Sequence, residues 1–211
     1  MLGKQYSRQN CSIARSLEVV GERWTLLIIR DAIYGVRRFN DFQAHLDVPK
    51  AVLSARLTGL VKDGILERRP DPDHRGRHLY ELTAAGRELW PVLHALLSWG
   101  GRHRQANSRV FKHASCGTVL DGRASCPRCQ LTPDLADILT EPAGDREPRR
   151  GDAVAVALRR PHRLLNPIEP SRSDVGGQRY GSDVGGQRYG SDVGGQRSGS
   201  DVGAERSGAP A

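Results

Sequence analysis

The chain has 211 residues, which is enough for one domain of ordinary size with a sizeable appendage. Thirty-two Lys and Arg against 24 Asp and Glu give a formal net charge of +8, a balance that favours polyanionic partners. No uninterrupted apolar run approaches the ~20 residues of a membrane span, and the first ten residues lack the hydrophobic region of a signal peptide. These features argue against a membrane protein and predict a location in the cytoplasm.

Bulky side chains are concentrated in the first half of the chain. Of the eleven aromatic residues, only Tyr180 and Tyr189 lie beyond Phe111, whereas 13 of the 24 Gly and six of the 12 Pro follow residue 140. A segment of this composition has little apolar area to offset the entropy of ordering. We therefore expect about 100 residues of globular core. The expected divisions are an N-terminal arm (1–10), a globular domain (11–104), a small metal-binding module (105–132), a linker without regular structure (133–172) and a disordered repeat tail (173–211).

Four helices are predicted before residue 64, because apolar residues recur there at helical spacing. Ser12 is a candidate N-cap, Gly21 and Gly35 should end the first two helices, Pro49 suits the first position of the fourth, and Gly64 should stop it. The second helix is apolar nearly all round, as expected for the centre of a small domain. The expected helices are 12–20, 23–33, 39–46 and 49–62.

A β-hairpin should follow. Residues 65–69 and 78–82 have the extended pattern of two strands, and the Pro- and Gly-containing segment 71–77 between them is turn-rich, which gives a hairpin with a basic tip at Arg75 and Arg77. Thr83 should then cap a long helix that Pro91 kinks, since proline cannot donate the usual backbone bond. The fold class predicted is mainly α with one small hairpin. The apolar stripe of the last helix comprises Leu89, Leu93, Leu96 and Leu97, with Trp90 beside it.

Many ordered positions within residues 11–104 also match a known family. The matching motifs are Cys11-Ser12-Ile13-Ala14-Arg15-Ser16-Leu17, Val20-Gly21-Glu22-Arg23-Trp24-Thr25-Leu26-Leu27-Ile28-Ile29-Arg30-Asp31, Arg38-Phe39, Leu53-Ser54-Ala55-Arg56-Leu57, Asp63-Gly64-Ile65-Leu66-Glu67-Arg68 and Tyr80-Glu81-Leu82-Thr83-Ala84-Ala85-Gly86. This stretch resembles the HxlR-type winged helix-turn-helix transcriptional regulators. The resemblance implies a homodimeric, nucleoid-associated bacterial repressor or activator that binds double-stranded DNA and is not an enzyme. The polar segment 71–77 is longer than the usual short wing.

The fourth helix is the candidate recognition helix. Its leucine-rich side must pack inward, which leaves a small, polar and basic face outward. Such a face fits the major groove, where Lys, Ser and Thr can bond base edges and Ala can touch the thymine methyl. Arg56 lies on the flank and should meet phosphate; a merely solvated helix face is the alternative. The outward residues are Lys50, Ala51, Ser54, Ala55, Thr58 and Lys62.

The hairpin supplies a second candidate contact to DNA. Arg75 and Arg77 lie at its tip, where guanidinium groups can bridge phosphates or enter a narrow minor groove. Arg68 and Arg69 lie lower on the strands. Four acidic residues nearly cancel these cations, so an internally paired, solvated hairpin is the alternative. Those residues are Glu67, Asp71, Asp73 and Glu81.

A metal site is predicted from two ligand pairs, His113 with Cys116 and Cys126 with Cys129. Each pair is separated by two residues, and an Asp-Gly turn signal lies between the pairs. Three thiolates and one imidazole suit tetrahedral zinc, and four protein ligands make a closed, structural site. The segment resembles a zinc ribbon. Three incidental cysteines in a loop remain the alternative.

Cys11 is left over from this set. At the start of the first helix its thiolate could be favoured by the helix N-terminus, with Arg15 one turn away. Some regulators of the family that it resembles sense oxidants or electrophiles through a cysteine in this region. Cys11 is thus a candidate redox sensor, and a small packing residue is the alternative.

Two function classes follow. The first is a homodimeric transcription regulator that pairs through the last helix, with an effector that the sequence does not reveal. The second is a zinc-ribbon nucleic-acid or protein adaptor in which the winged domain serves dimerisation or docking. The sequence contains no glycine-rich phosphate loop, nucleophile elbow or paired carboxylates that would argue for an enzyme.

From Ser173 a nine-residue unit beginning Ser-Asp-Val-Gly repeats four times, with too little apolar surface to stack as a solenoid.

Overall fold

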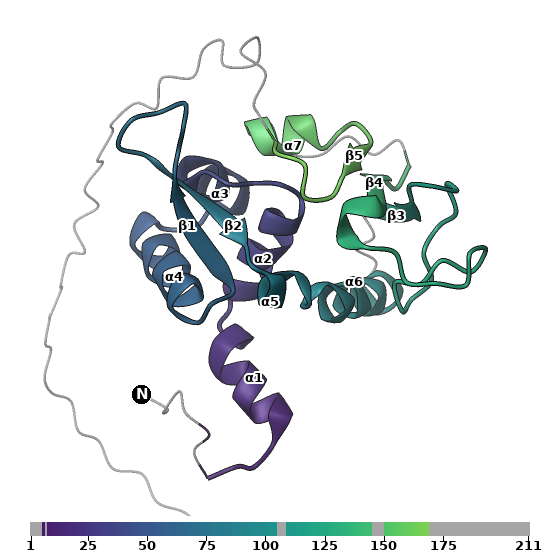
Figure 1. Ribbon diagram of the computed structural model, residues 1–211, viewed down its shortest axis with the longest axis horizontal. Helices are drawn as coiled ribbons and strands as arrows, with labels where there is room; N and C mark the ends of the chain where they lie inside the picture. The colour runs from purple at the N-terminus through teal and green to yellow at the C-terminus, as the bar shows by residue number, and fades with distance from the viewer. Residues whose placement is uncertain (1–5, 7, 105–108, 145–149, 169–211) are drawn as a thin grey trace, which may run out of the picture. The chain divides into compact units, whose positions relative to one another are not determined.

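The computed structural model describes residues 6, 8–104, 109–144 and 150–168 (Figure 1). The first set of elements is α1 (Ser12–Val20), α2 (Thr25–Ile33), α3 (Phe39–Leu46), α4 (Lys50–Lys62), β1 (Leu66–Pro70), β2 (His78–Leu82), α5 (Ala84–Arg87) and α6 (Trp90–Arg104). The second set is β3 (Arg109–His113), the 3-10 turn η1 (Leu135–Asp137), β4 (Ile138–Pro142), α7 (Ala153–Ala157) and β5 (His162–Arg163). Within these described residues, none of the helices is both long and apolar enough to cross a membrane.

The first half forms the predicted helices and hairpin. α2 supplies the centre of the core, with Ile28, Ile29 and Ile33 fully buried. α3 and α4 pack beside it, and β1 pairs with β2 in an antiparallel register that places Leu66 opposite Leu82. This order of three helices, a fourth helix and a hairpin is a winged helix-turn-helix.

Local details differ from the sequence expectation at three helix ends. Cys11, not Ser12, is the N-cap of α1, and Pro49 is the N-cap of α4 rather than its first residue. The predicted long helix is two helices, because Pro91 has no N–H to donate to the carbonyl of Arg87 and a new helix begins at Trp90. Thr83 caps α5 as expected, accepting a hydrogen bond from the N–H of Gly86 at 3.1 Å.

The described residues after α6, 109–144 and 150–168, are folded, which corrects the expected linker at 133–172 within those ranges. β3, β4 and β5 form an antiparallel sheet in that order, and the short helix α7 joins β4 to β5. Ile138, Val154 and Leu164 are almost completely buried. The few apolar residues suffice because they pack against a winged domain that already offers an apolar surface. The repeat tail at 173–211 lies outside the described residues.

The two halves share one core. Phe111 of β3 lies among aromatic rings of the winged domain, with centroids 5.1 Å from Trp90, 5.6 Å from His94 and 6.5 Å from Tyr34. Trp90, expected on the dimer surface, is buried inside the chain together with Leu93, because β3 covers that side of α6. Residues 109–144 and 150–168 are therefore an integral layer of the fold rather than an appendage.

Candidate nucleic-acid interface and metal centre

α4 presents one face to solvent because its other face is anchored in the core. Leu53, Leu57 and Leu60 are buried at helical spacing. The turn that sets the start of the helix places Asp47 in the left-handed region at φ 53°, followed by Val48 in the core. The orientation of the outer face is thus fixed by packing and not by the outer residues themselves.

All six residues predicted to face outward are exposed. Arg56, predicted on the flank, is half-buried, and its Nη1 lies 3.4 Å from Oε1 of Glu22. Because this carboxylate already offsets part of the charge, Arg56 is less free to bind phosphate than the sequence alone indicated. The exposed residues are Lys50, Ala51, Ser54, Ala55, Thr58 and Lys62.

The four acidic residues of the hairpin are all ion-paired, and their partners lie below its tip. Arg37 and Arg38, just before α3, contribute to these pairs, although no sequence pattern places them beside the hairpin. The pairs are Arg37 with Glu81 at 3.0 Å, Arg38 with Asp71 at 3.1 Å, Arg38 with Asp73 at 3.8 Å, Arg69 with Glu67 at 2.6 Å and Arg69 with Glu81 at 3.7 Å.

Asp71 organises the loop at the hairpin tip. Burial acts to raise its pKa, but the hydrogen bonds from the N–H of Asp73 and from Arg38 outweigh this and hold the pKa below its usual value. His74 lies 3.3 Å away on the same carboxylate. The loop is therefore tied to the start of α3 by the ion pair between Asp71 and Arg38.

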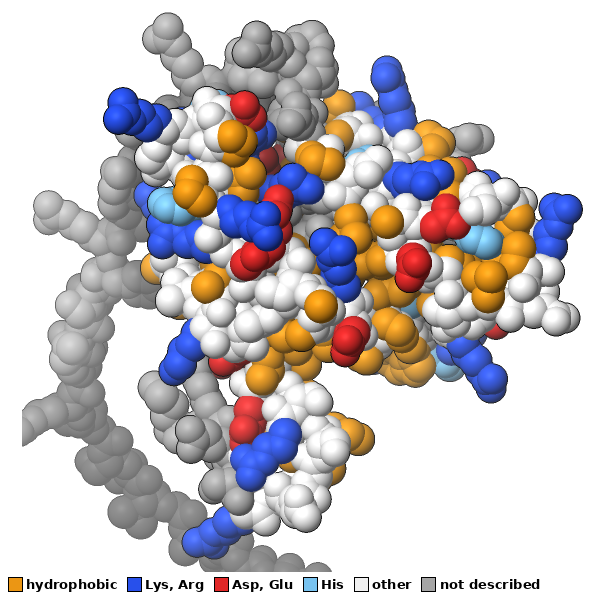
Figure 2. All heavy atoms as spheres, in the orientation of Figure 1, with side chains coloured by type: hydrophobic (Ala, Val, Ile, Leu, Met, Phe, Trp, Pro, Cys, Tyr) orange, Lys and Arg blue, Asp and Glu red, His pale blue; other side chains and the backbone are white. Residues whose placement is uncertain are grey.

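Arg75 and Arg77 remain available at that tip. Both are exposed, and within the described part of the chain neither forms an ion pair. Figure 2 shows basic side chains around the hairpin, including its tip, with acidic side chains among those lower down. The ion-paired alternative thus applies to the base of the hairpin, and the tip carries uncompensated positive charge.

The four predicted metal ligands come together. The ligand atoms of His113, Cys116, Cys126 and Cys129 all lie within 4.8 Å of one another, and the Sγ atoms of Cys116 and Cys126 are 3.5 Å apart. Tetrahedral zinc with Zn–S bonds of ~2.3 Å would separate two sulfurs by about 3.8 Å. The donor set and its spacing therefore fit a tetrahedral metal ion.

Two equivalent turns hold these ligands. In each, the residue that follows the second ligand donates its N–H to the carbonyl of the first: Gly117 to His113 at 2.8 Å, and Gln130 to Cys126 at 2.8 Å. Both donors have positive φ, 72° and 54°. The N–H of Cys129 also points at Sγ of Cys126 at 3.4 Å. This repeated geometry holds the two ligands of each pair on one side of their turn.

Hydrogen bonds in the cluster favour the charged form of one sulfur, that of Cys116. The side chain and backbone of Thr118 lower the pKa of Cys116 to about 6, so this thiol is largely anionic at neutral pH. The pKa of Cys129 is raised to about 11, chiefly by its hydrogen bond with Cys116. One thiolate thus forms readily at Cys116, and a bound cation would be needed to deprotonate Cys129 at neutral pH.

Comparison with known proteins identifies the winged domain. Residues 19–108 match the model of the HxlR-like helix-turn-helix family. An HTH-type transcriptional regulator of Mycobacterium tuberculosis H37Rv is 40% identical over 134 residues, which cover 62% of this chain and 85% of that protein. The chain belongs to the HxlR-like helix-turn-helix family.

Relatives differ in how far the similarity extends. A Mycobacterium bovis regulator matches to the same extent as the M. tuberculosis protein, so about 131 of the 211 residues are covered, more than the 104 that end with α6. YdeP of Bacillus subtilis is 28% identical over 107 residues, 49% of this chain and 84% of that protein. The mycobacterial similarity to this HxlR-like chain therefore reaches into the segment that follows the winged domain.

Asp137 is a site residue that the sequence did not reveal. Its Oδ2 lies 2.9 Å from Nε2 of His113 and accepts a hydrogen bond from Ser115 at 2.6 Å. A carboxylate on the outer ring nitrogen leaves Nδ1, which lies 3.4 Å from Cys116, for a metal. Asp137 lies 24 residues after His113 in the sequence. No local sequence pattern could link the two, because they meet only when β3 and β4 pair.

Cys11 lies apart from the metal ligands in the chain and is exposed. As N-cap of α1 it makes no side-chain capping hydrogen bond. Its exposure argues against the packing role and leaves its sulfur accessible to solvent.

Proposed function

We propose that this HxlR-like protein regulates transcription by binding duplex DNA, with α4 in the major groove and the hairpin tip on the backbone or in the minor groove. The observation that carries the proposal is the outer face of α4, where six small, polar or basic residues are exposed around a leucine anchor. The uncompensated Arg75 and Arg77 supply the charge that phosphate binding needs.

Binding-site selection from randomised duplex DNA tests this function. We expect an enriched two-fold motif with half-sites about one helical turn, ~10 bp, apart or a multiple of that. Failure to retain any duplex sequence selectively would overturn the proposal and favour the adaptor function, in which the winged domain serves docking alone.

Residues of the α4 face should control which sequence is bound. Ser54→Ala and Thr58→Ala should change base preference at one position of each half-site, by about 1 kcal/mol or more, because groups in the groove contact base edges. Repeating the selection with each variant measures this. An unchanged motif with uniformly weaker binding would instead assign these residues to phosphate contacts.

The hairpin tip should control affinity without sequence preference. Arg75→Ala should flatten the dependence of log Kobs on log salt concentration by about one unit, since one phosphate contact is lost. Arg69→Ala is the matched control, because Arg69 is also exposed on the hairpin but is paired with Glu67 and Glu81. Equal slopes for the two variants would remove the hairpin tip from the interface.

A homodimer is proposed through the uncovered face of α6. Val92, Leu96 and Trp99 are about half exposed along this helix, and Ile13 and Leu17 are exposed on α1. Their spacing on α6 gives a single apolar stripe, and Figure 2 shows hydrophobic side chains gathered over that helix. Because β3 covers Trp90 and Leu93, the dimer surface is displaced from the stripe that the sequence indicated.

Replacement of Leu96 by Asp should convert the dimer to a monomer in sedimentation at micromolar concentration, because the charge would lie inside an apolar interface. Leu131→Asp provides the control: Leu131 is equally exposed, at 47% against 48%, but lies in the metal-binding segment. A wild-type protein that sediments as a monomer would contradict the proposed dimer.

We also propose that His113, Cys116, Cys126 and Cys129 hold one structural zinc ion. The geometric fit, the anionic Cys116 and the carboxylate behind His113 support this assignment. Four protein ligands leave no open position for chemistry, so the metal would order the fold.

A further inference from the structure

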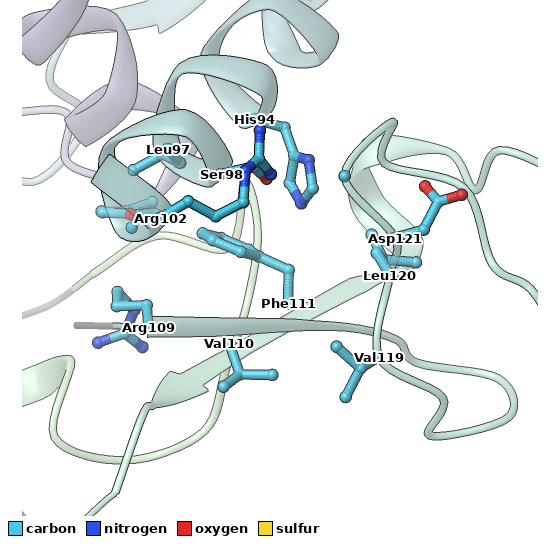
Figure 3. Close-up of a pocket in the computed structure, with 13 residues that line it drawn as sticks. His94, Leu97, Ser98, Arg102, Arg109, Val110, Phe111, Val119, Leu120 and Asp121 are labelled. Atoms are coloured by element: carbon cyan, nitrogen blue, oxygen red, sulfur yellow. The ribbon is translucent and has the colours of Figure 1, made fainter. Parts of the chain in front are cut away.

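A cavity of about 340 Å³ lies between α6 and the segment that links the two metal-ligand pairs. This is within the ~300–1,000 Å³ of typical small-molecule sites. Figure 3 shows α6 on one side, β3 on the other, and the segment carrying Val119, Leu120 and Asp121 at the end. The cavity therefore forms only because the winged domain and the metal-binding segment pack together.

The wall of the cavity is apolar and aromatic. Phe111 points from β3 toward α6, and Leu97 faces it from the helix (Figure 3). Leu120 is buried, whereas Val119 is 50% exposed at the edge. Facing ring and aliphatic surfaces of this kind bind a flat apolar body such as an aromatic ring.

Two guanidinium groups add positive charge to the lining. Arg102 reaches along α6 toward His94 in Figure 3, and a β-carbon on Gly122 would lie 3.8 Å from its Nη1. Arg109 is held by hydrogen bonds to Thr140 and to the carbonyl of Leu158, while its buried Nη2 has no partner within the described residues. Arg109 is thus engaged by the C-terminal layer, and the guanidinium that suits a carboxylate in the cavity is that of Arg102.

The acidic residue at the cavity does not cancel this charge locally. Asp121 accepts hydrogen bonds from the N–H groups of Ser125 at 2.9 Å and Arg123 at 2.8 Å, and these hold its pKa below the usual value. Its carboxylate is thus engaged by its own turn. Two cations against one such carboxylate leave the lining positive.

His94 supplies a hydrogen-bond acceptor, in contrast to the guanidinium donors. It is 5% exposed, and its Nδ1 has no hydrogen-bond partner in the described part of the chain. Burial lowers its pKa, although a hydrogen bond with the backbone of Gly122 opposes this, so the ring is neutral at pH 7. A neutral imidazole bonded through one nitrogen offers a lone pair at the other. The unpartnered Nδ1 of His94 can therefore accept a hydrogen bond from a ligand.

We propose that this cavity is a binding site for a small aromatic carboxylic acid that also carries a hydroxyl or amine donor. The ring would lie between Phe111 and Leu97, the carboxylate would meet the exposed Arg102, and the donor would bond His94. Such a ligand supplies an anion for Arg102 and a hydrogen-bond donor for the unpartnered Nδ1 of His94.

Binding would also join the two layers of the fold. α6 carries both the cavity wall and the exposed stripe of the proposed dimer, so the ligand is placed to change the spacing of the two α4 helices. This regulatory step rests on the proposed DNA-binding function; the binding site itself does not.

Titration calorimetry on the full chain, purified with zinc, tests the site without DNA. We expect one site for 4-hydroxybenzoate with Kd below ~1 mM. Binding should be at least about tenfold weaker for neutral 4-hydroxybenzyl alcohol, the difference expected for a charge-assisted contact, and several-fold weaker for benzoate. Tryptophan emission should change in parallel, because Trp90 contacts His94 and Phe111. No heat with either acid, or equal binding of acid and alcohol, would overturn the proposal.

Three variants locate the ligand. Ser98→Phe should abolish binding by filling the cavity, with an unchanged Tm. Arg102→Gln should weaken binding about tenfold or more, while Arg104→Gln, which removes the same charge from α6 outside the lining, should stay within about twofold. Full binding by Ser98→Phe, or equal losses in the two arginine variants, would place the ligand elsewhere and overturn the assignment. If the ligand binds but the DNA affinity of the wild type is unchanged, only the regulatory step fails.

Discussion

Gly35→Ala should destabilise the protein by about 3 kcal/mol or more, because a side chain at this position collides with the chain of the C-terminal layer. Gly35 has φ +93°, and an added Cβ would lie 1.7 Å from the carbonyl oxygen of Asn166. Two hydrogen bonds fix this approach, from the N–H of Leu165 to Ile33 at 2.8 Å and from the N–H of Ile168 to Gly35 at 3.0 Å. The backbone strain of about 1–2 kcal/mol thus adds to a clash that must separate the layers.

Gly64→Ala is the matched control. Gly64 has φ +70° and no atom within 4 Å of an added Cβ, so this variant should show a loss of only about 1 kcal/mol. Urea unfolding gives both values, and hydrogen exchange separates their causes: only Gly35→Ala should expose the amides of Leu165 and Ile168. Similar stability losses with both amides still protected would mean that the C-terminal segment is not docked on α2.

The winged domain could be predicted closely because its local signals agree with its packing. Gly64 ends α4 where the pattern changes from helical to extended, and the leucine side of that helix is the buried side. The sequence predicts a kink at Pro91 within one long helix, whereas the structure has two helices, because whether proline kinks or separates a helix depends on packing that one segment does not show. Such local consistency is what makes a fold readable from sequence.

The layer that follows α6 could be predicted only at its metal ligands. Composition indicated too little apolar surface for a core in residues 133–172, and that holds for a segment on its own. The structure buries Ile138, Val154 and Leu164 in a core that the winged domain had begun. Whether these residues become buried depends on the apolar surface of the winged domain, which no periodicity within the segment can indicate.

The partners in the ion pairs could likewise not be predicted from the sequence. The hairpin charges nearly cancel in number, and only the structure shows that Arg38 reaches across from the start of α3 to Asp71. The same applies to Arg56, whose ion pair with Glu22 joins α4 to the loop between α1 and α2. Counts of charge thus predicted the polyanionic partner class, whereas the position of free charge depended on tertiary contacts.

Cys126→Ser should remove one zinc ion per chain and lower Tm by about 10 °C or more. Cys126 is fully buried among the four ligand atoms, and serine is a poor ligand for a metal that prefers thiolate. Because Phe111 of β3 lies against Trp90 and Tyr34, loss of metal should reach the winged domain as well. Metal analysis under reducing, chelator-free conditions and thermal unfolding measure the two effects.

Cys11→Ser distinguishes this outcome from a general effect of thiol loss. Cys11 is exposed and outside the ligand cluster, so this variant should retain the zinc and the wild-type Tm. Lowering pH should release the metal from the wild type, since protons compete for sulfur and imidazole, and stability should fall with it. Absence of zinc from the wild type, or equal metal in the Cys126 and Cys11 variants, would refute the site. If the site holds, the Tm of Cys126→Ser measures how far the metal stabilises the docking of β3 on α6, because Phe111 lies two residues before the ligand His113 on the same strand.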